Sequence, residues 1–237
     1  GSEMCIRDRI CYHGVMDMFR NPKLAASVYA CEQDEIPVLQ ITSSMDIGEH
    51  PGCNRGNLYI LSNADSVRMY KNDRFIKEYR PEMSPYKHLK HGPILIDDFI
   101  GDALEKNERF RPKHAKEMAD AMNIVARGSL NHIPKRLYPT ALKLALLYHI
   151  DFAEVTKLYT KYIGDWGGTA TVYRFDAIKN GKVIKSVTKE PVNGIRLQAE
   201  ADHTNLTEHH SYDVALVRIR ACLLYTSPSP RDMRRSR

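Results

Sequence analysis

The chain has 237 residues and a formal net charge of +6 at pH 7. This length is enough for one domain of ordinary size together with pieces of neighbouring domains. No apolar run approaches the roughly 20 residues that a membrane-spanning helix requires, so the sequence predicts no such helix.

The two ends of the chain can be coded by complementary DNA strands. A nucleotide sequence that codes residues 1–9 has a complement that, read one base out of frame, codes Cys222-Leu-Leu-Tyr-Thr-Ser-Pro-Ser229. Termini related in this way resemble a translated sequencing adaptor on either side of a short insert. We therefore expect residues 1–9 and 222–237 to be adaptor sequence, and the chain to be an internal fragment of a longer protein.

Removing the two end segments changes what the composition implies. The last segment carries a charge of +3 and the first is neutral, so the net charge falls from +6 to +3, with both signs interspersed. We therefore expect neither a nucleic acid nor a membrane partner. Three cysteines remain (Cys11, Cys31 and Cys53), an odd number without a CxxC motif, which indicates neither a disulfide framework nor a zinc site. The compartment stays open, because a signal peptide would precede this fragment.

The first predicted element is a helix, followed by strands. Asn21 is a suitable N-cap, Pro22 fits the first turn, and apolar residues recur on one face until about Glu35. Alternating apolar residues and turn residues then predict four strands, at residues 37–42, 58–62, 66–70 and 74–79. Asn72-Asp73 joins the last two as a tight turn, since both residue types tolerate positive φ.

Helical spacing dominates residues 97–163. Pro112 opens a helix that Gly128 closes, and residues 141–148 form a second apolar run. Asp151 and Glu154 have the spacing of a capping box for a third helix, which Gly164 is placed to end.

Strand patterns return after the helices. Residues 169–175 lead to Asn180-Gly181, which is typical of a type I′ hairpin, and a further pair follows at 195–201 and 214–219. Strands, a helical block and strands again indicate a mainly β fold with an α insertion, namely a β-sandwich carrying a helical insertion.

Four segments resemble glycoside hydrolase family 2, especially its bacterial β-galactosidases. Tyr12-His-Gly-Val-Met-Asp-Met-Phe-Arg-Asn-Pro-Lys-Leu-Ala-Ala26 resembles the end of that family's catalytic (β/α)8 barrel. Ser62-Asn-Ala-Asp-Ser-Val-Arg-Met-Tyr-Lys-Asn-Asp73 and residues 168–187 are similar to strands of the immunoglobulin-like domain that follows the barrel. Residues 195–207 resemble the start of a next all-β domain.

The resemblance implies a domain organisation. Residues 10–35 would be the end of the barrel, with its last helix, and 36–193 an immunoglobulin-like sandwich with a helical insertion at about 97–163. Residues 194–221 would begin a second β-domain, truncated by the adaptor.

The same resemblance implies a β-galactoside or related β-glycoside as substrate of the full-length enzyme, without a cofactor. Family members are retaining hydrolases that use two glutamates, an acid/base and a nucleophile. Both would lie on barrel strands upstream of this fragment, so we expect the chain alone to be inactive. The alternative is a carbohydrate-binding or adhesive β-sandwich of a protein that is not a hydrolase; the barrel-like residues 12–26 argue against it. Sugar, linkage and oligomeric state stay open.

The sequence offers one candidate site, a substrate rim. The loop of residues 43–56 joins the first two strands and carries groups that hydrogen-bond sugar hydroxyls: Asp46, Glu49, His50 and Arg55. Trp166, the single tryptophan, lies among glycines, where it would stack on a sugar ring or else plug the junction of helices and sandwich. An exposed polar turn is the alternative for the loop. His50 and Cys53 have ligand-like spacing, but a structural metal site wants about four ligands, so we expect no metal.

Overall fold

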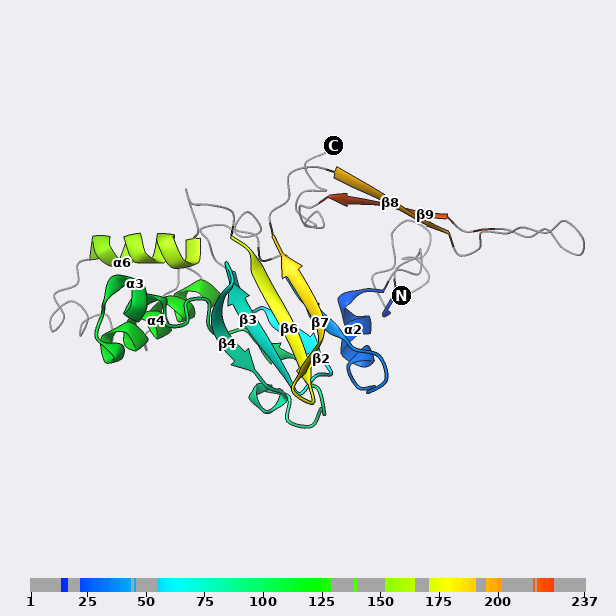
Figure 1. Cartoon of the computed structure of the whole chain (residues 1–237), viewed down its shortest axis with the longest axis horizontal. Helices are drawn as coiled ribbons and strands as arrows, with labels where there is room; N and C mark the ends of the chain where they lie inside the picture. Colours follow the sequence, from blue (N-terminus) through cyan, green and yellow to red (C-terminus); the bar gives the residue numbers. More distant parts are fainter. Residues whose placement is uncertain are drawn as a thin grey trace, which may run out of the picture. The chain divides into compact units, whose positions relative to one another are not determined.

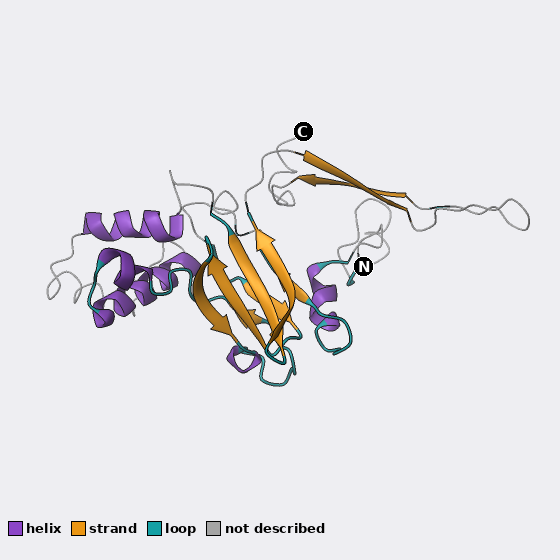
Figure 2. Cartoon of the chain, viewed as in Figure 1, coloured by secondary structure: helices purple, strands orange, loops and turns teal. Residues whose placement is uncertain are grey.

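The computed structural model describes residues 14–16, 22–43, 45, 55–128, 139, 152–164, 171–190, 195–201, 215 and 217–223. The chain divides into two compact units, Gly1–Glu190 and Pro191–Arg237. The first unit mixes helices with antiparallel sheets: strands occupy its middle, α3, α4 and α6 gather on one side of them, and α2 lies on the other (Figure 1). Figure 2 shows the same division by secondary structure.

Helix α2 (Leu24–Ala30) is shorter at both ends than the sequence predicts. The predicted start is wrong, because Pro22 pairs with Met16 in an isolated antiparallel bridge and Lys23 serves as the N-cap. Asn21, the expected cap, lies outside the described residues. At the other end, the Gln33 side-chain oxygen accepts hydrogen bonds from the backbone of the two residues that follow Asp34, at 2.7 and 2.8 Å. This side-chain turn competes with a continued helix.

Three strands form the first sheet: β1 (Leu39–Ile41), β2 (Tyr59–Ser62) and β5 (Ile94–Leu95), all antiparallel, with β2 in the middle. Ile41 lies opposite Ile60, and Ile60 opposite Ile94. These three isoleucines are buried, so one face of this sheet belongs to the core.

The second sheet has the order β4 (Arg74–Tyr79), β3 (Ser66–Lys71), β6 (Tyr173–Lys179) and β7 (Lys182–Lys189), again antiparallel. Both predicted tight turns are confirmed. Asn72 and Asp73 have φ of 49° and 61°, and Asn180 and Gly181 have φ of 51° and 73°.

Between β5 and β6 the chain forms α3 (Ala103–Glu108), α4 (Pro112–Arg127), α6 (Phe152–Tyr159) and the π-helical turn η5 (Thr160–Gly164); the 3-10 turn η3 (Pro81–Met83) precedes β5. Helix α4 begins at Pro112 and ends before Gly128, as predicted. Gly128 adopts an extended conformation (φ −87°, ψ −158°), so it ends the helix without a left-handed cap. The predicted run 141–148 and the cap Asp151 lie outside the described residues.

One hydrophobic core joins both sheets to the helices. Met69 from β3, Phe175 from β6 and Met118 from α4 are all fully buried in it. A buried amide links helix α4 to the segment that follows β5: Asn123 accepts a hydrogen bond from the Phe99 backbone at 3.0 Å and donates to Asp98 at 2.8 Å. The helices are therefore part of the same packed unit as the strands.

The second unit contains β8 (Ile195–Ala201) and β9 (Val217–Leu223), paired antiparallel with Ala199 opposite Ile219. Strand β9 begins later than predicted and runs two residues past 221, where we expect native sequence to stop. Ladder pairing uses main-chain groups, which any residue except proline supplies in full, so this pairing does not test whether residues 222 and 223 are adaptor sequence.

Within the described ranges, none of the helices has the length and apolar content needed to cross a bilayer.

Candidate functional site

Of the five rim residues predicted from sequence, the structure describes one. Asp46, Glu49, His50 and Trp166 lie outside the described residues. Arg55 is described, and its side chain is inside the protein, with only 3% of the residue exposed. Its guanidinium bonds to backbone groups of the protein, and the hydrogen bond from Arg55 to a sugar hydroxyl stays a prediction.

The Arg55 guanidinium joins two backbone segments that are far apart in sequence. Its Nη1 donates to the Met45 carbonyl at 2.9 Å, and its Nη2 donates to the Ile163 carbonyl at 3.1 Å. The backbone nitrogen of Arg55 donates to the carbonyl of Ala126, near the end of α4, at 2.8 Å. One residue thus connects the β1–β2 segment, helix α4 and the end of η5.

Two aromatic rings enclose the same guanidinium. Its central carbon lies 5.5 Å from the ring centroid of Phe99 and 5.3 Å from that of Tyr173, and both rings are fully buried. A buried charge is costly unless it is hydrogen-bonded, and guanidinium groups suit such sites because they stack on rings and are weakly hydrated. Arg55 therefore acts as an internal tie between backbone segments.

Lys71 of β3 forms a second tie at this place. Its Nζ donates to the Tyr162 carbonyl at 2.7 Å and lies 5.6 Å from the Tyr173 centroid. Two successive carbonyls of η5, at Tyr162 and Ile163, thus accept from two cations. Carbonyls at the end of a helical segment have no partner within the helix, which leaves them available for these bonds.

The start of strand β6 is held beside the Lys71 tie. Asn72, in the β3–β4 turn, donates its backbone N–H to the Val172 carbonyl and accepts from the Val172 N–H through its side chain, both at 2.8 Å. Hydrogen bonds from Arg55 and Asn72 therefore hold the chain at one end of the core, close to where several loops begin. The residues held are Met45, Ala126, Ile163 and Val172.

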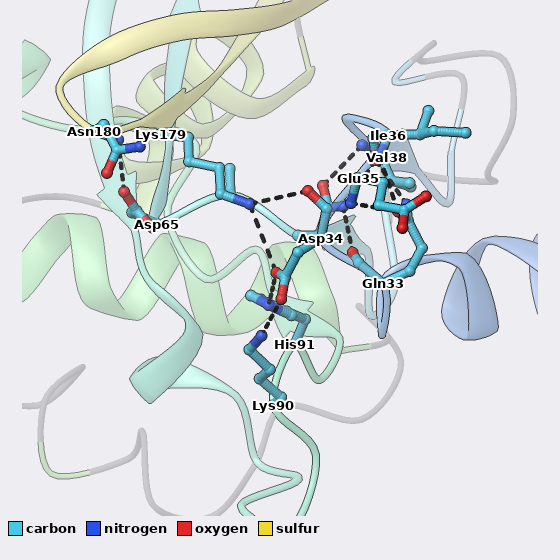
Figure 3. A network of polar contacts seen from close by, with 12 residues as sticks. Gln33, Asp34, Glu35, Ile36, Val38, Asp65, Lys90, His91, Lys179 and Asn180 are labelled. Carbon is cyan, nitrogen blue, oxygen red and sulfur yellow. Dashed lines mark hydrogen bonds and ion pairs between the residues drawn. The ribbon is translucent and has the colours of Figure 1, made fainter.

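A different polar network holds the segment between α2 and β1 (Figure 3). Asn63 follows β2 directly, whereas Arg55 precedes β2, so the two ties belong to opposite ends of that strand. The buried Asn63 side chain accepts from the Val38 backbone at 2.8 Å and donates to the carbonyls of Gln33 and Ile36 at 2.7 and 2.8 Å. This segment is thus fixed to the sheet by side-chain bonds.

Asp34 is the charged centre of the network in Figure 3. Its carboxylate binds Lys90, and lies 3.6 Å from both the His91 Nε2 and the Lys179 Nζ. The hydrogen bond from Lys90, with the nearby charge of Lys179, lowers the pKa of Asp34. The carboxylate is exposed on its other side, so we interpret the cluster as a surface ion-pair network rather than a catalytic group.

An apolar groove of about 220 Å³ runs between α2 and the three-stranded sheet. Leu24 and Val28 line it from the helix, Tyr59 and Leu61 from β2, and Tyr86 and Pro93 from the segment before β5. A sugar site needs several convergent polar groups, and this lining is almost entirely apolar. The groove reflects partial packing of α2, none of whose residues is buried.

No metal centre emerges among the described residues: no three His, Cys, Asp or Glu side chains come together there as ligands. His50 and Cys53 are outside those ranges.

Sequence reasoning missed the ties made by Lys71, Asn72 and Asn63. For Asn72 there was a partial indication, because the sequence predicts the tight turn in which this residue lies. Nothing in the spacing of Lys71 indicates that it reaches a carbonyl 91 residues away.

The comparisons with known proteins point to glycosidases. No family model matches the chain. A β-galactosidase from Thermoanaerobacterium thermosulfurigenes is 40% identical over 93 residues, which are 38% of this chain and 13% of the relative. A β-galactosidase from Thermoanaerobacter pseudethanolicus is 38% identical over 90 residues, or 37% of this chain and 12% of the relative. The chain thus matches about an eighth of each enzyme.

Among solved structures, a β-glycosidase from Bacteroides vulgatus covers 88% of this chain with a TM-score of 0.46 and 11% identity, using 17% of its own length.

Proposed function

We propose that the chain is a non-catalytic C-terminal region of a retaining family 2 glycoside hydrolase whose activity is that of a β-galactosidase. The observation that carries this proposal is the 40% identity to a β-galactosidase over 93 residues. The match covers 13% of that enzyme, and the proposal places the catalytic glutamates outside the matched part. The barrel-like residues 12–26 favour a hydrolase over a separate binding module.

In this proposal residues 36–193 are an immunoglobulin-like sandwich with a helical insertion. The three-stranded and four-stranded antiparallel sheets, which share one core, support that interpretation. The position of α3, α4 and α6 between β5 and β6 agrees with an insertion. Residues 10–35 would end the barrel, 194–221 would begin another β-domain, and 1–9 and 222–237 would be adaptor sequence.

The region would brace the barrel and shape the rim of its pocket. The proposed rim comprises Asp46, Glu49 and His50 in the β1–β2 segment, with Trp166 in the segment before β6. The tie at Arg55 supports this grouping, because it joins Met45, next to Asp46, to Ile163, three residues before Trp166. Loops held by a rigid scaffold are common places for binding residues.

Kinetics of the full-length enzyme test the rim. Asp46→Ala and His50→Ala should each raise the KM for a natural disaccharide and leave kcat nearly unchanged, because they remove binding without touching the catalytic glutamates. The free energy of unfolding should stay within about 0.5 kcal/mol of the parent, as is usual for surface changes. Glu105→Ala, at an exposed position of α3, is the control. Parental KM values in both rim variants would remove the rim from the proposal.

A further inference from the structure

The contacts of Arg55 carry an inference about how the rim is built. Met45 and Ile163 are 118 residues apart in the sequence (163 − 45), yet their carbonyls accept from the two terminal nitrogens of one guanidinium. The two segments are therefore joined directly through the fixed geometry of one planar group.

Arginine is the side chain that meets both requirements of this position. Its planar fork places several donors at fixed angles, so it reaches two carbonyls at once, and its cation lies over the rings of Phe99 and Tyr173. Lysine keeps a positive charge but concentrates its donors on one nitrogen. Methionine matches part of the length and offers no donor.

We propose that Arg55 is a positioning residue: it fixes the backbone at Met45 relative to the backbone at Ile163, and so the spacing of the two segments that lead into the rim. The assignment of a rim to these segments rests on the proposed function. The coupling of the two segments does not, because it follows from the contacts of Arg55 alone.

Hydrogen exchange of the 237-residue chain tests the coupling. Arg55→Met should raise the exchange of backbone amides in peptides ending near Met45 and in peptides covering η5. Arg55→Lys should keep the fold through its charge near the two rings, yet raise exchange in at least one of the same two regions. Unchanged exchange at both regions in folded Arg55→Lys and Arg55→Met would overturn the positioning role.

Asn63→Ala is the matched control. It removes an equally buried polar tie at the opposite end of β2. Its effect should appear in residues 33–38, which Asn63 holds, and not in η5. Similar exchange patterns in the Asn63 and Arg55 variants would mean that both only loosen the whole fold, and would also overturn the proposal.

Steady-state kinetics of the full-length enzyme separate this inference from the proposed function. Arg55→Lys should raise KM about tenfold, equivalent to roughly 1.4 kcal/mol of lost binding, with kcat nearly unchanged, while Asn63→Ala keeps the parental KM. Altered exchange together with an unchanged KM would support positioning by Arg55 and contradict the rim. A fall in kcat alone would contradict a role in substrate binding.

Discussion

At the scale of single residues, buried polar side chains hold separate segments of the fold together. Arg55, Asn63 and Asn123 are each nearly inaccessible, and each bonds backbone groups of segments distant in sequence. Removing one partner of a buried hydrogen bond leaves the other unsatisfied, which costs about 1–3 kcal/mol. Such residues determine where loops leave the core, although they carry no chemistry themselves.

Glu108 gives a pH-dependent example. Its Oε1 accepts from the Lys161 Nζ and from the Tyr162 hydroxyl, both at 2.7 Å, and these hydrogen bonds lower the pKa of the Glu108 carboxyl. A lowered carboxyl pKa stabilises the folded state above the pKa of the unfolded chain, and the contribution is lost as the pH falls through the lower, folded value.

Glu108→Gln should therefore reduce the free energy of unfolding by at most about 1 kcal/mol at pH 7, because solvent screens this partly exposed pair, and the loss should be smaller at pH 3 than at pH 7. Urea unfolding at both pH values measures the difference. Glu105→Gln, exposed on the same helix, should change neither value. An equal loss for Glu108→Gln at pH 3 would show that packing, and not the charge, stabilises this position.

At the scale of elements, alternation and turn residues determined what could be predicted. The strands β1 to β4 lie close to their expected ranges, because a half-buried strand repeats every two residues. Strand β6 begins at Tyr173 rather than at residue 169, although the positive-φ turn that follows it is where the sequence predicts it. The predicted start of α2 was wrong, because Pro22 pairs with Met16, six residues earlier, instead of opening the helix. A proline is compatible with both a first helical turn and an extended bridge, so the residue type alone did not distinguish them.

The β6–β7 turn allows a direct test of this reasoning. Gly181 has a φ of +73°, a conformation that costs other residues about 1–2 kcal/mol, and a β-branched side chain suffers most. Gly181→Val should lower the free energy of unfolding by at least about 1 kcal/mol. Asn180→Gly, which keeps the left-handed conformation accessible, should stay within about 0.5 kcal/mol of the parent. Denaturant unfolding of the two variants would contradict the turn assignment if they were equally stable.

The candidate site was less predictable than the fold. An arginine between Asn54 and Gly56 in a polar stretch is typical of a solvated loop, and the sequence alone suggests an exposed guanidinium. Its burial depends on Phe99, Ile163 and Tyr173, which lie 44 to 118 residues further along the chain. Only the folded arrangement brings these partners around it. Asp46, Glu49, His50 and Trp166 remain predictions.

At the scale of the whole molecule, the proposed function is that of a supporting region within a larger glycosidase. Two antiparallel sheets and their helices share one core, which suits a rigid brace. The described carboxylates with lowered pKa values, at Asp34, Glu78, Asp102 and Glu108, are all held in ion pairs with Lys or Arg. Ion pairs of this kind are structural contacts, whereas glycosidase chemistry needs two carboxyl groups facing one sugar.

Hydrolysis of a chromogenic β-galactoside tests this central claim most directly. The 237-residue chain and the full-length enzyme that carries both glutamates would be assayed side by side at equal concentration. We predict release of the chromophore by the full-length enzyme and none above the buffer blank by the chain. Turnover that co-purifies with the chain through successive columns would contradict the account, because it would place catalytic residues within this region.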